Sequence, residues 1–268
     1  MSNPQEAAIE VDVLIIGAGP TGLAMAVEAL RHGLSCRIIE SKSSRLLNQS
    51  KALILHARTL EQLQAMGDGR VVNALVEEGM KMKSLKAFIG KRKVGRLHEF
   101  DECDEHWGDT TFPFWLNVPQ HRTECILEQE LVRLGGKVEW STCLKTLQTV
   151  EAPFVDDGNG NFNDIIDINI GGPVRALIDR AGHNEIIQCK WAIGCDGGRS
   201  LTRDQAGLKL DRESWNEFFY LADFELGSNE SKEFFKKMKE IYSSTPMALW
   251  QCSVSARVGR MEKVIYSV

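Results

Sequence analysis

The sequence has no excess of basic residues and no paired-cysteine motif. Its 268 residues include 37 acidic against 32 basic side chains, whereas a nucleic-acid-binding domain is typically basic. Its seven cysteines form no CxxC pair and no cysteine–histidine pattern, which argues against a disulfide framework and against a metal site. We therefore expect reduced thiols, a cytoplasmic protein and a small-molecule ligand rather than a nucleic acid.

The sequence also lacks the features of a signal peptide or a membrane span. Its most apolar stretch, residues 11–30, is interrupted by three glycines, a proline and Glu28. The ten residues before it contain no lysine or arginine, although a secretory signal begins with positive charge. We read this stretch as a buried strand followed by a buried helix, and we expect no membrane span.

The spacing of apolar residues predicts an α/β fold. Residues 11–16 form a continuous apolar run, typical of a strand covered on both faces, and residues 22–31 have helical spacing. A short strand at residues 35–39 completes a strand–helix–strand unit. The other predicted segments are helices at residues 59–66, 70–78, 120–134 and 231–242, strands at 137–140 and 190–194, and a loop tip at 156–163. Residues 80–114 instead suit antiparallel strands.

A Gly-Ala-Gly-Pro-Thr-Gly sequence joins the first strand to the first helix. Gly17 permits a tight turn, Gly19 lets backbone amides approach a pyrophosphate, and Gly22 lets the helix pack closely on the strand. Glu40 ends the second strand, 18 residues after Gly22, where an acid accepts hydrogen bonds from a ribose. The acid disfavours a 2′-phosphate, so the motif predicts FAD or NAD and leaves open which. The alternative is a glycine-rich turn of some other α/β fold.

Three further blocks of sequence follow the glycine motif. They are Ser50-Lys51-Ala52 with Arg58-Thr59-Leu60-Glu61, Pro119-Gln120 with Glu124 and Leu127, and Ile193-Gly194-Cys195-Asp196-Gly197-Gly198-Arg199-Ser200 with Arg203 and Gly207. In order and spacing the four blocks resemble the flavoprotein aromatic hydroxylases, the FAD-dependent monooxygenases that include phenol and para-hydroxybenzoate hydroxylases. The resemblance covers about residues 11–225 and favours FAD over NAD at the glycine motif.

The resemblance implies an FAD-binding role for residues in each block. Asp196 and Gly197 match residues near the flavin ribityl chain, and Arg199 matches a region that assists the nicotinamide cofactor. An ordinary turn and helix cap is the alternative for Asp196. Gln120 matches a glutamine that contacts FAD, or else is a polar residue at a helix start. Lys51 stands where the family usually has an arginine near the FAD phosphates, and a lysine supplies the charge without the bidentate fork.

The resemblance also implies a reaction. In the family, NADPH or NADH reduces FAD, the reduced flavin and O₂ form a C4a-hydroperoxide, and one oxygen passes to an aromatic or enolic small molecule. The cofactor carries this chemistry. His56 is the one titratable residue in the stretch 53–56, where some phenol-oxidising members have an acid, but a lone histidine is more often structural. We therefore assign no catalytic residue.

The resemblance divides the chain into interleaved segments. These are an FAD-binding domain at residues 1–80, 115–145 and 185–212, a β-hairpin or meander region at 146–184, and an incomplete substrate domain at 81–114 and 213–268. The expected fold is a Rossmann-like FAD-binding parallel sheet with an interleaved, incomplete antiparallel substrate-domain sheet. The oligomeric state, monomer or homodimer, stays open.

One motif of the family, Gly-Asp-Ala-Ala-His, is not found. The two Gly-Asp pairs, at Gly67 and Gly108, do not lead from a buried strand into a helix, so we read both as turns. We therefore expect a chain truncated at its C-terminus relative to the family. The leading prediction is an FAD-dependent monooxygenase. The alternatives are a non-catalytic flavin-binding remnant and another type of FAD-dependent oxidoreductase, against which the Asp196 block argues.

Overall fold

A computed structural model of the chain describes most of its residues. They are residues 9–45, 54–81, 84–89, 92–99, 109–149, 173–211, 221–225, 251–253 and 263–267. The chain divides into two compact units: Met1–Leu47 with Thr123–Glu213, and Asn48–Arg122 with Ser214–Val268. The domain segments expected from the resemblance have boundaries that differ from those of these two units, because they divide the chain by function and not by contacts. Those segments remain a prediction.

The first unit contains a six-stranded sheet with the strand order β8-β2-β1-β11-β10-β9. Its strands are β1 (Ile9–Ile16), β2 (Cys36–Ile39), β8 (Val138–Glu139), β9 (Thr142–Thr149), β10 (Val174–Arg180) and β11 (His183–Gly194). Strands β8, β2, β1 and β11 run parallel, and β9 and β10 extend the sheet in antiparallel fashion. The predicted parallel sheet is thus present, with β1 at its centre.

The strand predicted at residues 190–194 is longer than expected. β11 begins at His183, pairs with β10 over its first part, and pairs with β1 from Ile187 to Gly194. The described strands of the region expected as a separate hairpin or meander therefore belong to the main sheet. The long strand pairs with β10, the other arm of a tight hairpin, and with β1, which lies far away in the sequence. No local pattern reveals the pairing with β1.

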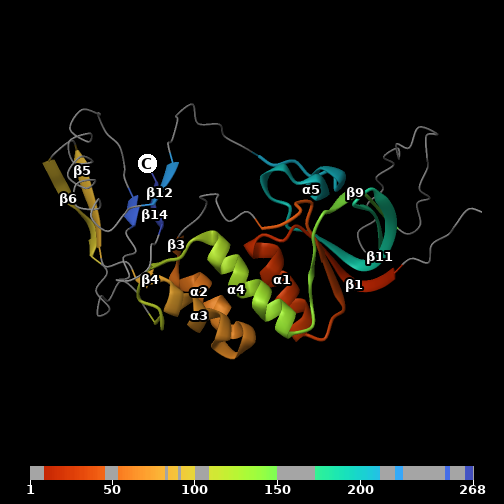
Figure 1. Ribbon diagram of the computed structural model, residues 1–268, viewed down its shortest axis with the longest axis horizontal. Coiled ribbons are helices and arrows are strands. Elements are labelled where there is room, and N and C mark those ends of the chain that lie inside the picture. The colour runs from red at the N-terminus through yellow and green to blue at the C-terminus, as the bar shows by residue number, and fades with distance from the viewer. Residues whose placement is uncertain are drawn as a thin grey trace, which may run out of the picture. The chain divides into compact units, whose positions relative to one another are not determined.

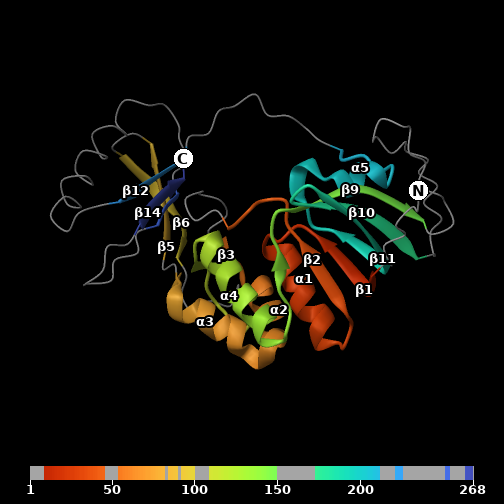
Figure 2. The same ribbon diagram turned by 45° about the vertical axis from the view of Figure 1, so that its right-hand side comes forward.

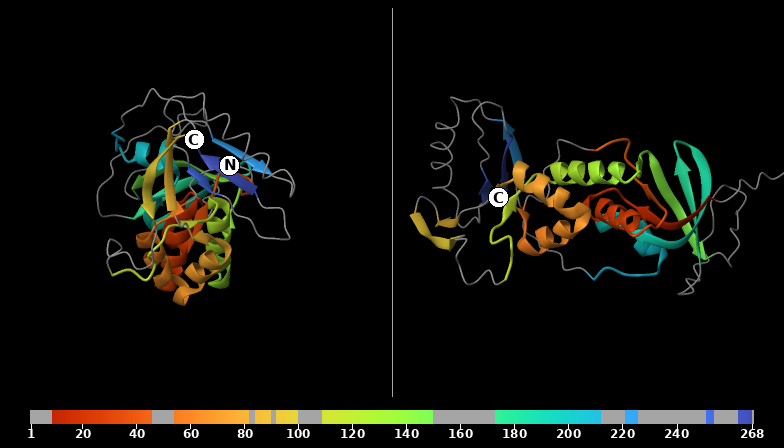
Figure 3. Two further views of the ribbon diagram at one scale, coloured as in Figure 1. Left: turned by 90° about the vertical axis from the view of Figure 1, so that its left-hand side faces the viewer. Right: turned by 90° about the horizontal axis from the view of Figure 1, so that it is seen from below.

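In the first unit, the helix that follows β1 lies against this sheet (Figures 1 and 2). α1 (Pro20–Arg31) packs on β1 and β2, and it buries Leu23, Ala26 and Val27. Figure 3 shows α1 against these strands from a further direction. α4 (Gln120–Arg133) enters the first unit at Thr123 and buries the apolar face that its spacing predicts. No helix within the described ranges is long and apolar enough to cross a membrane.

The second unit combines two helices with small antiparallel sheets. Its helices are α2 (Ala57–Ala65) and α3 (Arg70–Glu78), joined by the 3-10 turn η1 (Met66–Gly69). Its strands are β3 (Ile54–Leu55), β7 (Leu116–Asn117) and β4 (Met80–Lys81) in one sheet, β5 (Ser84–Ile89) and β6 (Arg92–Glu99) in a hairpin, and β12 (Leu221–Glu225), β14 (Lys263–Ser267) and β13 (Gln251–Ser253) in another sheet.

Antiparallel pairing in the second unit agrees with the prediction for residues 80–114. Gly67 and Asp68 have positive φ angles of 57° and 52°, so this Gly-Asp pair is a turn, as predicted. The helix predicted at residues 231–242 and the loop tip predicted at 156–163 lie outside the described residues.

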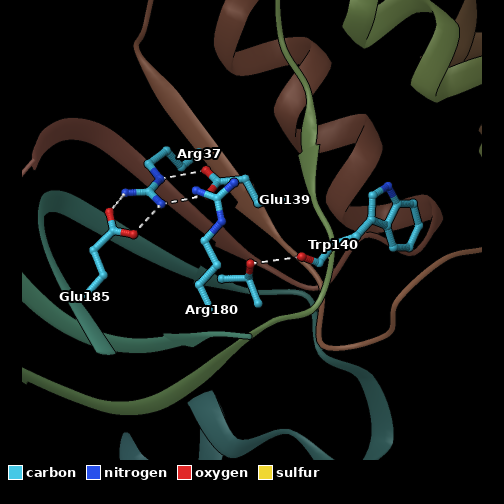
Figure 4. Close-up of polar contacts among 6 residues, drawn as sticks. Arg37, Glu139, Trp140, Arg180 and Glu185 are labelled. Atoms are coloured by element: carbon cyan, nitrogen blue, oxygen red, sulfur yellow. Dashed lines mark hydrogen bonds and ion pairs between the residues drawn. The ribbon is translucent and has the colours of Figure 1, made fainter. Parts of the chain in front are cut away.

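An ionic cluster links four strands of the main sheet (Figure 4). Arg37 of β2 donates to both carboxylate oxygens of Glu139 on β8, each at 2.7 Å, and to Glu185 on β11. Arg180 of β10 approaches Glu139 at 3.7 Å. The side chains of Arg37 and Glu139 are only 12% and 6% exposed. Burial by itself would lower the pKa of Arg37, but hydrogen bonds to two carboxylates raise it above its ordinary value, so the guanidinium stays charged.

Arg37→Ala should destabilise the protein strongly. The variant leaves the carboxylate of Glu139 buried without its main partner, and breaking a buried ion pair from one side costs about 3–5 kcal/mol. Urea unfolding followed by circular dichroism measures this loss. Arg31→Ala removes a more exposed pair with Glu28 and should cost less than about 1 kcal/mol. Equal losses in the two variants would contradict the central role of Arg37.

Candidate functional site

The predicted glycine turn lies at the carboxyl end of β1. Gly17 has a φ of +104°, a conformation that favours glycine, and its N–H donates to the Ile39 carbonyl of β2 at 2.8 Å. A Cβ on Gly17 would stand 2.5 Å from the carbonyl oxygen of Cys195, which follows β11. The loops that follow β1 and β11 are therefore in backbone contact, and a side chain at position 17 would separate them.

The other two glycines of the motif have different roles. A Cβ on Gly22 would stand 1.9 Å from the Gly17 carbonyl oxygen, so Gly22 is needed for α1 to pack on the turn. A Cβ on Gly19 would meet no atom within 4 Å. Gly19 is the N-cap of α1 and supplies no side-chain cap. The space beside it is therefore open to a phosphate group at the helix N-terminus.

Glu40 follows β2 beside the same turn. Its Oε2 accepts a hydrogen bond from the Ala18 N–H at 3.0 Å, and its Oε1 accepts from the Lys42 N–H at 3.1 Å and the Ser41 hydroxyl at 3.2 Å. Burial tends to raise the pKa of Glu40, but the hydrogen bonds outweigh burial and hold the pKa below its ordinary value. Because a carboxylate offers about four acceptor positions, Glu40 retains capacity for a ribose hydroxyl while it fixes the glycine turn.

Asp196 lies one residue beyond the contact with Gly17. The N–H of Cys195 donates to the Ile16 carbonyl at 2.7 Å, which continues the pairing of β11 with β1 up to the loop. The Asp196 carboxylate accepts from the Ser200 hydroxyl at 2.5 Å and from the Thr202 N–H at 3.0 Å. Burial tends to raise the pKa of Asp196, and these hydrogen bonds lower it below its ordinary value. Asp196 therefore stabilises a turn and the start of a helix, which agrees with the alternative interpretation of an ordinary turn and helix cap.

Comparison with known proteins shows the family of the chain. A family model described as FAD binding domain matches residues 10–165 and 171–257, which include the glycine turn, Glu40 and the Asp196 loop. The chain belongs to the FAD binding domain family. The family, the α/β fold and the cofactor FAD predicted from the sequence are thereby confirmed.

Several relatives of the chain are named as monooxygenases. The chain is 33% identical over 200 residues to 6-methylpretetramide 4-monooxygenase of Streptomyces rimosus, covering 74% of this chain and 30% of that protein. It is 28% identical over 225 residues to pentachlorophenol 4-monooxygenase of Sphingobium chlorophenolicum, covering 81% of this chain and 36% of that protein. The solved structure of the anhydrotetracycline hydroxylase OxyS of Streptomyces rimosus aligns with a TM-score of 0.61 and 27% identity, covering 80% of this chain and 37% of that one. The chain spans about a third of the length of these relatives.

The residues of the glycine turn fit the adenosine and pyrophosphate part of FAD. Gly19 leaves room at the N-terminus of α1, where backbone N–H groups and the helix dipole attract an anion. Glu40 offers an ionised acceptor beside this space. The described residues contain no cluster of His, Cys, Asp and Glu that could hold a metal ion.

The other predicted FAD residues lie in different parts of the chain. Arg199 is exposed at the end of the 3-10 turn η3 (Gly197–Arg199), and Gly197 has a φ of +83°. Gln120 is the first residue of α4 and belongs to the second unit. Lys51 lies outside the described residues. The contacts of all of these residues, and of Asp196, with FAD stay predictions.

Sequence reasoning missed Arg45, which holds the segment after Glu40. Arg45 donates to Glu124 and Glu128 of α4 at 2.5 and 2.6 Å, and its guanidinium lies 5.7 Å from the ring centroid of Trp140. Two glutamates four residues apart on one helix face repel each other. Their spacing could therefore have indicated a cationic partner.

Asp196→Asn should lower stability at neutral pH and should lose this effect in acid. A carboxamide accepts with one oxygen where the carboxylate accepts with two, which costs about 1–2 kcal/mol. Because the folded pKa of Asp196 is lowered, its contribution is present above the unfolded pKa of about 3.9 and is lost as the pH falls through the folded pKa. Urea unfolding at neutral pH and below about pH 4 measures the difference from wild type.

The exposed Asp211 supplies the control for this prediction. Asp211→Asn should match wild type under both conditions. A destabilisation by Asp196→Asn that persists unchanged in acid would contradict a role for the ionised carboxylate.

Proposed function

We propose that the chain is the FAD-binding part of a monooxygenase that uses NADH or NADPH and O₂ to hydroxylate a phenolic or enolic small molecule. The backbone contact between the glycine turn and the Asp196 loop carries this proposal, because it brings the two most specific motifs together. Relatives named as monooxygenases support the reaction type. Pentachlorophenol, the substrate in one of those names, is a phenol and supports the substrate class.

The proposed roles follow from position for the glycine turn and Glu40, and from the family resemblance for the other residues. The N-terminus of α1 would bind the pyrophosphate of FAD, and Glu40 would accept a hydrogen bond from the adenosine ribose. Asp196 and Gly197 would lie by the ribityl chain, Lys51 and Gln120 would add further contacts with FAD, and Arg199 would assist the nicotinamide cofactor. When bound, FAD supplies the redox and oxygen-transfer chemistry, and the protein contributes binding, orientation and exclusion of water.

No residue is proposed to be catalytic in its own right. His56, the one titratable residue of its stretch, lies edge-to-face against Trp115 with the ring centroids 4.9 Å apart. This packing supports a structural role for the imidazole. A homodimer and a cytoplasmic location stay predictions.

Gly19→Val should abolish FAD binding without unfolding the protein. Its side chain would fill the open space beside the helix N-terminus, and the extended backbone at Gly19 accepts any residue. We expect the dissociation constant for FAD, measured by flavin fluorescence, to rise at least about 100-fold. Gly22→Ala would instead place a methyl group against the Gly17 carbonyl and should cost about 3 kcal/mol or more of stability. FAD binding by Gly19→Val at wild-type affinity would exclude this location for the phosphates.

Turnover by the flavin-loaded chain tests the reaction. Oxidation of NADH and of NADPH is followed with and without pentachlorophenol or an unsubstituted phenol, under isotopically labelled O₂. We expect a phenol to stimulate oxidation and labelled oxygen to enter the product. Flavin binding without NAD(P)H oxidation would favour the non-catalytic alternative, and oxidation without a labelled product would favour another FAD-dependent oxidoreductase.

A further inference from the structure

The short helix after the Asp196 loop is held with little help from apolar packing. This helix, α5 (Leu201–Gln205), has five residues, and Gln205 is the one that is buried. The neighbouring apolar side chains are largely exposed: Leu201 at 39%, Leu208 at 63% and Leu210 at 50%. A helix of this length is not stable by itself in water. Its position must therefore depend on polar contacts.

The buried contact of α5 is made by the side-chain amide of Gln205. Its Oε1 accepts from the Leu147 N–H at 2.7 Å, and its Nε2 donates to the Lys145 carbonyl at 2.8 Å. Both backbone groups belong to β9, the edge strand of the six-stranded sheet. The carboxamide thus bonds to the edge strand as a neighbouring peptide group would.

The contact lies at an irregularity in β9. Thr146 pairs with Leu177 of β10 and Leu144 pairs with Ile178, so Lys145 has no pairing partner on β10 at this register shift. A bulge of this kind disturbs the ladder and leaves backbone groups in need of other partners. Gln205 bonds to the carbonyl of this extra residue and to the N–H two residues later, which specifies one position for α5 along the edge.

The other end of α5 is tied to the nucleotide site. Asp196 accepts from the Ser200 hydroxyl and from the Thr202 N–H, and the Ser200 hydroxyl accepts from the Arg203 N–H at 2.9 Å. The loop and the helix therefore form one short rigid segment. It is anchored to the end of β1 at its start, through the hydrogen bond from the Cys195 N–H to the Ile16 carbonyl, and to β9 at its end, through Gln205.

We infer that Gln205 is a positioning residue that holds the Asp196 loop in the geometry that binds FAD. This inference rests on the proposed function. Without the two hydrogen bonds to β9, the segment from Asp196 to Gln205 keeps its internal bonds but pivots at Cys195. The Asp196 loop then spends less time in the binding geometry, and the apparent affinity for FAD falls with that fraction.

Substitutions of Gln205 in the full chain test the inference. Gln205→Leu removes both hydrogen bonds at similar volume, and we expect the dissociation constant for FAD to rise roughly tenfold. Gln62→Leu makes the same chemical change at an exposed position of α2 and should leave the affinity unchanged. Hydrogen exchange at the Leu147 amide should accelerate in Gln205→Leu and remain slow in the control.

Gln205→Glu distinguishes positioning from general destabilisation. An ionised carboxylate accepts from the Leu147 N–H but opposes the Lys145 carbonyl, whereas a protonated carboxyl reproduces both bonds. Charged residues close by in the chain are already paired, Lys145 with Asp179 at 3.2 Å and Arg203 with Asp204 at 3.4 Å. Relative to wild type at the same pH, FAD binding should be roughly tenfold weaker at about pH 8 and should recover to within about threefold at about pH 5.5.

The outcomes separate this inference from the proposed function. A wild-type chain that does not bind FAD would overturn both. A wild-type chain that binds FAD, together with Gln205 variants of unchanged affinity, would overturn the positioning role alone. If Gln205→Leu fails to fold, recovery of FAD affinity by Gln205→Glu in acid supports the role, and a constant deficit from about pH 8 to about pH 5.5 contradicts it.

Discussion

The nucleotide site depends on the close approach of two backbone loops at the carboxyl ends of the parallel strands. β1 and β11 are neighbours and end together, so the turn after β1 meets the loop after β11. The Cys195 carbonyl occupies the place that a Cβ on Gly17 would need, and the Gly17 carbonyl occupies the place that a Cβ on Gly22 would need. The absence of side chains at these two positions lets the strands, α1 and the Asp196 loop converge.

The carboxylates at the site stabilise its turns in the absence of a ligand. Glu40 accepts from the backbone of the glycine turn, and Asp196 accepts from the start of α5. Both groups have lowered pKa values because hydrogen bonds favour their ionised forms. A loop whose acceptors are already oriented loses less conformational entropy when a nucleotide binds. The hydrogen bonds that stabilise the turns therefore also hold these acceptors in position for a nucleotide.

Polar side chains away from the turns fix the elements that carry them. Arg37 links β2 to its neighbours, Arg45 ties the segment after Glu40 to α4, and Gln205 bonds α5 to β9. Each joins positions that are far apart in the sequence, and each side chain is largely buried. Removal of one partner from such a buried pair leaves the other unsatisfied, which makes these contacts costly to lose. They therefore help to fix the positions of these elements relative to one another within the first unit.

The sequence by itself determined the first strand, the helix after it, the glycine turn, Glu40 and α4, because each has a local signature in apolar spacing or in glycine position. It also indicated FAD through motifs of fixed order. Only the tertiary structure decided that β11 serves two partners, that β9 and β10 join the main sheet, and that Asp196 is engaged in its own turn. The physical reason is that the pairing of β11 with β1 and the bond from Gln205 to β9 join residues distant in the chain, where no local pattern shows them. A carboxylate or carboxamide such as Asp196 or Gln205 looks the same in the sequence whether it faces water, a ligand or a sheet edge.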